Sequence, residues 1–249
     1  MNHRGILVPC TIAAALAFLT CAACTSSPGA PKADTEVLPP SAVVEFSLLY
    51  GRNCAGCHGV DGKGGAAMAL ANPVFLAIAD DTVIRHTAAN GVPGTPMPAF
   101  AQKAGGMLTD QQIDALVRGI RSWANPGLFQ DTTLPPYAAQ TRGDPQLGVQ
   151  VYRTYCSSCH GTDGRGGSKG SSIVDGSFLA LISDQQLRTI VISGRPELGA
   201  PDWRGDVEGR PMSTQEISDV VAWLSSQRPR FAGQPYPISS VDRTKGEPR

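Results

Sequence analysis

Two short clusters of cysteine and histidine carry the chemistry that this sequence offers. Each has two thiols three residues apart and a histidine directly after the second thiol. They are Cys54, Cys57 and His58 in the first cluster and Cys156, Cys159 and His160 in the second. Two thiols at this spacing can bond to the vinyl groups of a porphyrin while the histidine meets the iron, so C-x-x-C-H is a c-type haem attachment signal.

Three other uses of these residue types are a thioredoxin-like redox pair, part of a zinc site and a disulfide. The redox pair needs a βαβ setting, which the sequence lacks, and tetrahedral zinc needs further ligands at matching spacing. The surroundings of the clusters favour haem, because they repeat as well. An offset of 102 places Tyr50 on Tyr152 and extends both motifs to C-x-x-C-H-G-x-D-G-[KR]-G-G. This internal duplication predicts two haems in two related domains.

These repeated motifs resemble those of class I c-type cytochromes in a di-haem form. The resemblance covers roughly residues 41–228. It implies an all-α fold of two tandem small helical cytochrome c domains, each around a covalently bound haem c. It also implies an electron carrier, similar to the membrane-associated di-haem cytochromes that work beside quinol-oxidising complexes and haem-copper oxidases. The expected partners are therefore a quinol-oxidising complex, a terminal oxidase or a soluble cytochrome.

Two other functions remain open from the sequence alone. A haem enzyme of the di-haem peroxidase type would leave one iron open for a small oxidant. That family generally has a longer chain and distal acid–base residues, and we find no such constellation and predict no catalytic residue. A fixed cytochrome subunit of a larger oxidoreductase complex would have the same sequence features as a free carrier.

Composition sets further limits. The chain has 249 residues, with 21 basic and 21 acidic side chains and a formal net charge of +0. It has no run of lysine or arginine, which argues against nucleic acid as a partner. Domains of roughly ninety residues bury only a marginal core, so we expect each haem to complete the core of its domain.

The N-terminal segment is typical of an export signal. Arg4 is followed by the apolar run 12–19 and by small residues just before Cys24. The segment resembles a bacterial lipoprotein processing site, although Cys21 stands where such sites usually have an aliphatic residue. We expect export to the periplasmic or extracytoplasmic face of a bacterial membrane and lipid anchoring at Cys24. An uncleaved membrane anchor and ordinary signal cleavage are the alternatives.

Proline-rich stretches and the repeat predict the domain order. The segments are a lipoprotein-type signal peptide at 1–24, a flexible tether at 25–40, the first cytochrome c domain at 41–125, a linker at 126–143, the second cytochrome c domain at 144–230 and a tail at 231–249. The prolines of the linker should make it semi-rigid and limit the separation of the two haems.

Capping signals predict where the helices begin. Ser41 and Asp144 are expected to cap the helix that leads into each C-x-x-C-H motif. Ser183 begins a capping box for a short helix in the second repeat. Thr109 and Ser213 begin the last helix of each domain in the same way, followed by apolar residues at i, i+3, i+4 and i+7. In the resembled family this last helix crosses the first one.

The sixth iron ligand is predicted for the first haem from the segment 94–100. This segment resembles the methionine loop of the family, so Met97 is the expected ligand opposite His58. A His/Met pair raises the reduction potential relative to two histidines, because the thioether favours the ferrous state. His86 is the other candidate donor.

The second domain departs from this pattern. An offset of 103 places Ala200, which has no donor atom, on Met97. The one methionine of the second domain, Met212, aligns with Leu108 and has an alternative role as an apolar residue at a helix start. We predict Met212 as the sixth ligand of the second haem, with a vacant or water-bound iron or another donor as the alternatives.

Two supporting roles complete the predictions. A ligating imidazole usually donates its second N–H to a fixed acceptor. The resemblance implies that the Pro73 carbonyl accepts this bond in the first domain, with Gly176 in its place in the second. The paired residues Arg85 and Arg188 are expected on solvated faces, with haem propionates as the alternative.

Overall fold

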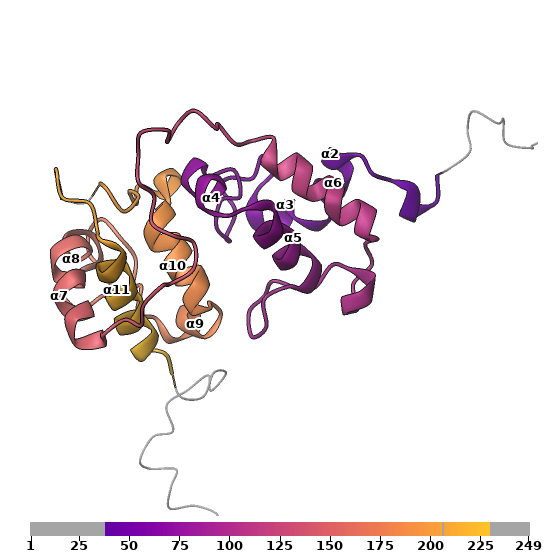
Figure 1. Cartoon of the computed structure of the whole chain (residues 1–249). Helices are drawn as coiled ribbons and strands as arrows, with labels where there is room; N and C mark the ends of the chain where they lie inside the picture. The colour runs from indigo at the N-terminus through magenta and orange to yellow at the C-terminus, as the bar shows by residue number, and fades with distance from the viewer. Residues whose placement is uncertain (1–37, 206, 230–249) are drawn as a thin grey trace, which may run out of the picture. The chain divides into compact units, whose positions relative to one another are not determined.

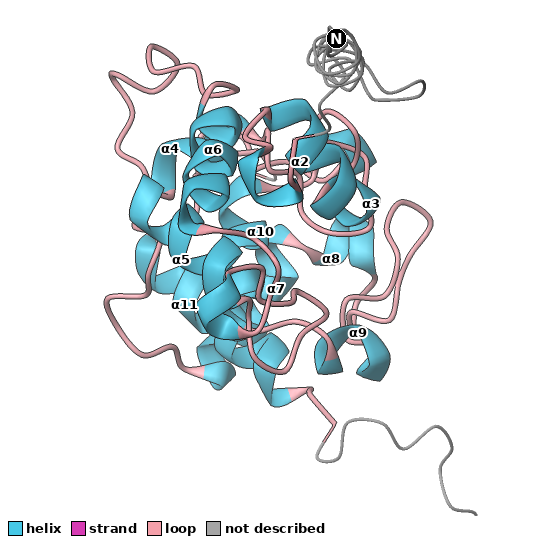
Figure 2. Ribbon diagram, turned by 90° about the vertical axis from the view of Figure 1, so that its right-hand side faces the viewer, coloured by secondary structure: helices cyan, strands magenta, loops and turns pink. Residues whose placement is uncertain are grey.

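The structure is a computed structural model that describes residues 38–205 and 207–229. The regular elements within these ranges are all helical, without a β-strand (Figure 2). This confirms the all-α prediction. No helix in the described ranges is long and apolar enough to span a membrane. The predicted signal peptide, the anchor residue Cys24 and the C-terminal tail at 231–249 lie outside the described residues.

A boundary after Ala42 separates two units of the chain. The 3₁₀ turn η3 (Pro40–Ala42) belongs to the first unit, and both C-x-x-C-H motifs belong to the second, which begins at Val43. In chain order (Figure 1) the second unit contains α2 (Phe46–Asn53), α3 (Ala55–His58), α4 (Pro73–Ile78), α5 (Asp81–Asn90), η4 (Gln102–Ala104), α6 (Asp110–Arg121), α7 (Pro145–Tyr155), α8 (Ser157–His160), α9 (Gly176–Ala180), α10 (Asp184–Ser193), η5 (Pro196–Leu198) and α11 (Thr214–Ser226).

The helices that lead into the motifs begin with acidic caps. Asp144 caps α7 as predicted, because its carboxylate accepts the Gln146 N–H at 2.8 Å. The prediction that Ser41 caps α2 is wrong. The carboxylate of Glu45 accepts the backbone N–H groups of Ser47 and Leu48 at 2.9 and 2.8 Å and so satisfies donors of the first turn. The helix therefore begins at Phe46 rather than near Ser41.

The three predicted capping boxes are confirmed. The hydroxyls of Thr109, Ser183 and Ser213 each accept a backbone N–H three residues further on, at 3.2 Å in every case. In return the side chain of that third residue accepts the N–H of the capping residue. These reciprocal bonds satisfy two donors that the first turn of a helix would otherwise leave open.

The first and last helices pack tightly in each repeat. A Cβ added to Gly119 of α6 would lie 2.0 Å from the Phe46 ring of α2. A Cβ added to Gly148 of α7 would lie 2.1 Å from the carbonyl oxygen of Asp219 in α11. A larger residue would meet the Phe46 ring at Gly119 and the Asp219 backbone at Gly148, so the implied packing of the first helix against the last is confirmed.

The two hydrophobic cores follow the two repeats with one exception. Val74 of α4 is 3 % exposed and packs with the core of the second repeat. Ile78 of the same helix packs against that core from its edge, and α4 contacts α10. The linker also contacts the second core, on which its residues Phe129 and Leu134 pack.

The repeated arginines have different surroundings. Arg85 lies at the surface and pairs with Asp114 at 2.7 Å and Asp110 at 3.2 Å. The prediction of a solvated face is wrong for Arg188, which is 2 % exposed. Its guanidinium donates to the linker carbonyls of Pro136 (2.9 Å, from Nη2) and Tyr137 (3.1 Å, from Nε). Burial lowers the pKa of Arg188.

Candidate haem sites

Each C-x-x-C-H motif occupies a single helical turn after a longer helix. Cys54 and Cys156 are the C-caps of α2 and α7, and their backbone N–H groups bond back to Tyr50 and Tyr152 at 2.8 Å. The short helices α3 and α8 then end at the histidines. The geometry of the motif is therefore the same in the two repeats.

One ring nitrogen of each histidine is fixed by a backbone carbonyl. Nδ1 lies 2.8 Å from the Met68 oxygen in His58 and 2.7 Å from the Ser171 oxygen in His160. A carbonyl only accepts, so Nδ1 carries the proton and Nε2 keeps its lone pair for a metal. The expectation that Pro73 and Gly176 supply these carbonyls is wrong. The acceptor comes instead from the loop that precedes α4 in the first repeat and α9 in the second.

The environment of His58 favours a neutral ring. The side chain is 8 % exposed, and this burial lowers the pKa of His58. The positive charge of Arg195 lowers the pKa further, while the hydrogen bond to Met68 acts in the opposite direction. A neutral imidazole with Nδ1 protonated is the form in which histidine binds a metal. The residues therefore fit an axial ligand of haem iron.

A tyrosine holds the loop that follows each histidine. The Tyr50 hydroxyl donates to the Gly59 carbonyl at 2.9 Å, and Tyr152 donates to the Gly161 carbonyl in the same way. Gly59 and Gly161 have φ values of 83° and 80°, which only glycine adopts readily. A Cβ on Gly59 would lie 1.6 Å from the Lys63 oxygen. These contacts explain why tyrosine and glycine recur with the motif.

The thiols are not arranged as a reactive redox pair. Burial, with a smaller contribution from Cys57, raises the pKa of Cys54 to about 11. A redox-active pair requires a thiolate and therefore a lowered pKa. Cys54, Cys57 and Cys159 form no disulfide. Across 38–205 and 207–229, no three His, Cys, Asp or Glu side chains are grouped so as to hold a metal ion.

The predicted ligand Met97 lies on a closed loop in the first repeat. The Val92 N–H donates to the Met97 carbonyl at 3.0 Å. The Thr95 hydroxyl accepts the Met97 N–H at 3.3 Å and donates to the Val92 carbonyl at 2.8 Å. Three bonds thus hold the backbone that carries the half-buried Met97 side chain. His86 lies instead on the exposed face of α5, with Nδ1 3.1 Å from the Asn90 amide nitrogen.

Ala200 occupies the place of Met97 in the second repeat. The Arg195 N–H donates to its carbonyl at 2.9 Å, which is the counterpart of the bond from Val92 to Met97. The offset of 103 is therefore correct in space as well as in sequence. The backbone of the loop is retained without a donor side chain.

Met212 occupies the place of Leu108. Its N–H donates to the Trp203 carbonyl at 2.9 Å, just as the Leu108 N–H donates to the Phe100 carbonyl at 2.7 Å. Met212 is 6 % exposed and packs in the second core, and Leu108 is 7 % exposed in the first. The role of Met212 as an iron ligand stays a prediction.

Comparison with known families gives the context for this geometry. A family model described as cytochrome c oxidase, cbb3-type, subunit III matches residues 41–118 and 143–224. The chain belongs to this family. It is a cytochrome c of the electron-transfer type, and its two C-x-x-C-H motifs fit two covalently attached haem c groups. The two matched segments coincide with the two repeats.

Individual relatives are also cytochromes. The cytochrome bc1 complex cytochrome c subunits of Mycobacterium tuberculosis and Mycobacterium bovis are 26 % identical over 226 residues, which covers 88 % of this chain and 73 % of theirs. The cbb3-type cytochrome c oxidase subunit FixP of Sinorhizobium medicae is 30 % identical over 136 residues, covering 50 % of this chain and 41 % of FixP. Among solved structures, the c-type cytochrome KustC0563 is 28 % identical, with a TM-score of 0.29 over 32 % of this chain.

Proposed function

We propose that this di-haem cytochrome works on the extracytoplasmic side of a bacterial membrane, anchored through a lipid on Cys24, as an electron-transfer partner or subunit of a quinol-oxidising complex. The observation that carries the proposal is the duplicated motif in which each histidine has Nδ1 bonded to a carbonyl and Nε2 available. The mycobacterial relatives support the choice of complex, because they align with 88 % of the chain and bear the name of a bc1 complex subunit.

The chain would hold each cofactor with one set of residues. The thiols of Cys54 and Cys57, and of Cys156 and Cys159, would form the thioether bonds. His58 and His160 would each coordinate the iron of one haem through Nε2, and Met97 would also coordinate the iron of the first. When bound, haem c supplies a one-electron ferric/ferrous couple, and no substrate bond has to be made or broken.

The protein also limits the movement of the histidine loops and the access of water to the His58 ring. The Tyr50 and Tyr152 hydroxyls hold the histidine loops in place, which reduces the rearrangement that accompanies a change in charge. His58 is buried, so water has little access to its ring. A ligand set that stays in one arrangement in both oxidation states suits electron transfer rather than catalysis at an open metal.

The mass of the matured protein tests the central claim. Protein matured in a bacterial periplasm should carry two haem additions, and the Cys54→Ala/Cys57→Ala and Cys156→Ala/Cys159→Ala double variants should each carry one. A mass with one haem in the unmodified protein, or with zinc instead, would refute the proposal. For the partner, membranes that contain a quinol-oxidising complex should reduce the protein on addition of quinol.

The anchor is tested separately. Replacing Cys24 by Ser should move the protein from the membrane fraction to the soluble fraction without a change in haem content. Retention of Cys24→Ser in the membrane would assign the attachment to an uncleaved N-terminal segment or to a partner protein. Detection of lipid-modified Cys24 by mass spectrometry provides the direct measurement.

A second function is supported by one observation, the alanine at position 200. If Met212 does not ligate the second haem, that iron is open to a small ligand, as in a haem enzyme of di-haem peroxidase type. Carbon monoxide added to the reduced protein separates the two functions. A six-coordinate His/Met iron resists the gas, whereas rapid stoichiometric binding to one of the two haems would favour the enzyme.

A further inference from the structure

One side chain of the second domain reaches the histidine loop of the first. Arg195 follows α10 and begins the loop that ends at Ala200, the counterpart of the Met97 loop. Its Nη2 donates to the Gly65 carbonyl at 3.0 Å, across 130 residues of sequence. Its Nε pairs with Glu197, and the two side chains are only 14 % and 19 % exposed. Arg195 is therefore held in a fixed, mostly buried position.

Gly65 belongs to the structure that positions His58. A Cβ added to Gly65 would lie 2.1 Å from the Cys57 oxygen and 2.7 Å from the Gly59 nitrogen. The Gly65 backbone thus packs directly on both neighbours of His58. A guanidinium that bonds to the Gly65 carbonyl consequently sits beside the proximal loop of the first haem site.

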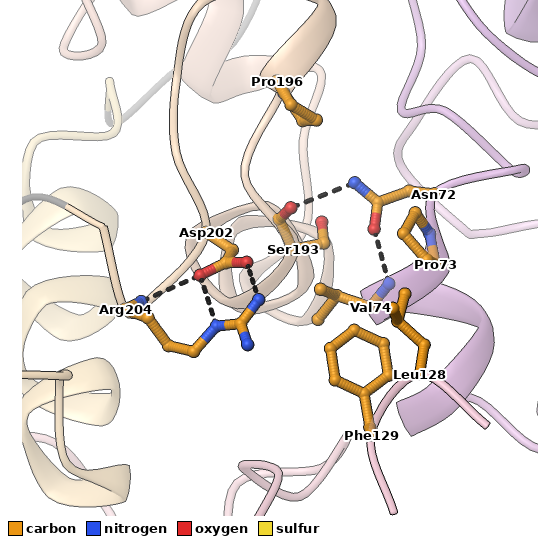
Figure 3. A pocket seen from close by; sticks show the side chains of 9 residues that line it. All are labelled: Asn72, Pro73, Val74, Leu128, Phe129, Ser193, Pro196, Asp202 and Arg204. Carbon is orange, nitrogen blue, oxygen red and sulfur yellow. Dashed lines mark hydrogen bonds and ion pairs between the residues drawn. The ribbon is translucent and has the colours of Figure 1, made fainter. Parts of the chain in front are cut away.

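The contact between the domains is supported at a second point. The Asn72 amide group donates to the Ser193 carbonyl at 3.0 Å, and both residues are buried (Figure 3). The same Asn72 side chain accepts the N–H groups that begin α4. Ser193 ends α10, two residues before Arg195. The end of α10 is thereby fixed against the first domain.

The repeat shows that this arginine is not required by the loop itself. Val92 is the counterpart of Arg195, and its N–H makes the same bond to the carbonyl at the loop end. An apolar residue therefore closes the same turn in the first domain. The cation is an addition in the second domain, placed where it contacts the first.

We propose that Arg195 is a positioning residue of the first haem that is supplied by the second domain, and that its charge raises the reduction potential of that haem. The proposal rests on ligation of the first haem by His58. Oxidation adds a positive charge at the iron, so a fixed cation nearby destabilises the ferric state relative to the ferrous state. The loop over one haem then contributes to the electrostatics of the other.

The sign of the effect can be tested with three variants in the full-length matured protein. Both potentials are measured by redox titration, and the first haem is the one whose potential changes in Met97→Ala. Arg195→Gln should lower this potential, and Glu197→Gln should raise it. A unit charge about 10 Å from a redox centre, at effective dielectric constants of about 40 to 20, changes a redox equilibrium by about 4-fold to 16-fold, and this range is the size of effect expected for each variant. Arg195→Lys keeps the charge and should restore most of the potential.

The opposite signs distinguish charge from packing. Arg195→Gln and Glu197→Gln both break the same ion pair, so a purely structural role predicts that both variants move the potential in the same direction. Such a result, or an unchanged first potential in Arg195→Gln, would overturn the proposal. Arg153→Gln, which removes a charge from an exposed site on α7, is the control and should leave the first potential unchanged. Haem mass in every variant reports independently on the proposed function.

Discussion

The two repeats hold their histidines in the same way but differ in the loop that is predicted to supply the second iron ligand. In both, a tyrosine hydroxyl fixes the loop after the motif and a loop carbonyl accepts a hydrogen bond from histidine Nδ1. In the predicted ligand loop, the methionine of the first repeat is replaced by Ala200, and the leucine that precedes the last helix is replaced by Met212. The motif and the loop that holds its histidine are thus alike in the two repeats, whereas the residues of the predicted ligand loop differ.

With Met97 as the predicted ligand of the first haem, this difference predicts that the two haems differ in potential. The proximal side must keep two thiols and an imidazole in a fixed relation for the covalent bonds to form. The distal side need only supply a ligand of suitable strength, and the choice of that ligand changes the potential. A pair of unequal centres on one chain gives electron transfer a preferred direction, which two identical centres would not.

Loss of Met97 should have the largest effect. Met97→Ala should lower the potential of the first haem by about 0.1 V, within the ~0.8 V range that axial ligands span, because the ferrous state loses its thioether. The weak red absorption band from sulfur-to-iron charge transfer should disappear while haem stays attached. Met107→Ala, at an 83 % exposed position, is the control and should change neither property. An unchanged potential in Met97→Ala would direct attention to His86.

Exchange of the residues at one equivalent position tests the second haem. Met212→Leu installs the residue that the first repeat has there, and such a swap usually costs less than about 1.5 kcal/mol in stability. If Met212 is the ligand, this variant should lower the second potential and allow carbon monoxide to bind one haem. Leu108→Met is the matched control and should leave both potentials in place. Wild-type behaviour of Met212→Leu would assign Met212 to the core alone.

The paired arginines should differ in their contribution to stability. Arg188→Met should lower the free energy of unfolding by about 2–4 kcal/mol, because the Pro136 and Tyr137 carbonyls lose charged donors in a buried site. Arg85→Met should change it far less, since exposed ion pairs contribute little. Denaturant unfolding of the haem-loaded protein measures both. Equal effects would show that the link from α10 to the linker adds nothing to the stability of the second domain.

The sequence predicted those features that depend on neighbouring residues. The capping boxes at Thr109, Ser183 and Ser213 and the equivalence of Ala200 with Met97 follow from short spacings and the repeat, and all are confirmed. The role of Arg188 could not be predicted in this way. Its two carbonyl partners lie 51 and 52 residues away in a segment without helical period, and its third partner is the Ser218 hydroxyl on α11.

The backbone carbonyls that accept the histidine hydrogen bonds could not be predicted from the sequence either. Any residue in the loop after His58 offers a backbone oxygen, so residue type does not single out Met68. The folding of Val74 into the core of the second repeat is a similar case, because the periodicity of α4 shows that a face is apolar but not which core it joins. For the contact between the repeats, the sequence offers one hint. Arg195 is charged, whereas the equivalent residue of the first repeat is Val92.

The smallest expected effect comes from the capping boxes of the two last helices. The third residue of the box is the neutral Gln112 in the first domain and the ionisable Glu216 in the second. Burial raises the pKa of Glu216, but hydrogen bonds from Ser213 and the charge of Arg210 outweigh it. The pKa of Glu216 is therefore lowered from its ordinary value of 4.5. This lowered folded-state pKa means that the ionised carboxylate stabilises the folded state.

The resulting stabilisation is fully present above the unfolded-state pKa and is lost as the pH falls through the lower folded-state value. Unfolding of the second domain should consequently become easier below about pH 4 through this group, an effect that the cap of the first domain does not share. Glu216→Gln copies the first domain and should remove that part of the pH dependence while keeping the reciprocal hydrogen bonds. Thr109 and Gln112 stay unchanged in this variant, so unfolding monitored at the first haem provides the internal control. If the pH profile of Glu216→Gln matches that of the unmodified protein, the carboxylate of the second cap is not the titrating group.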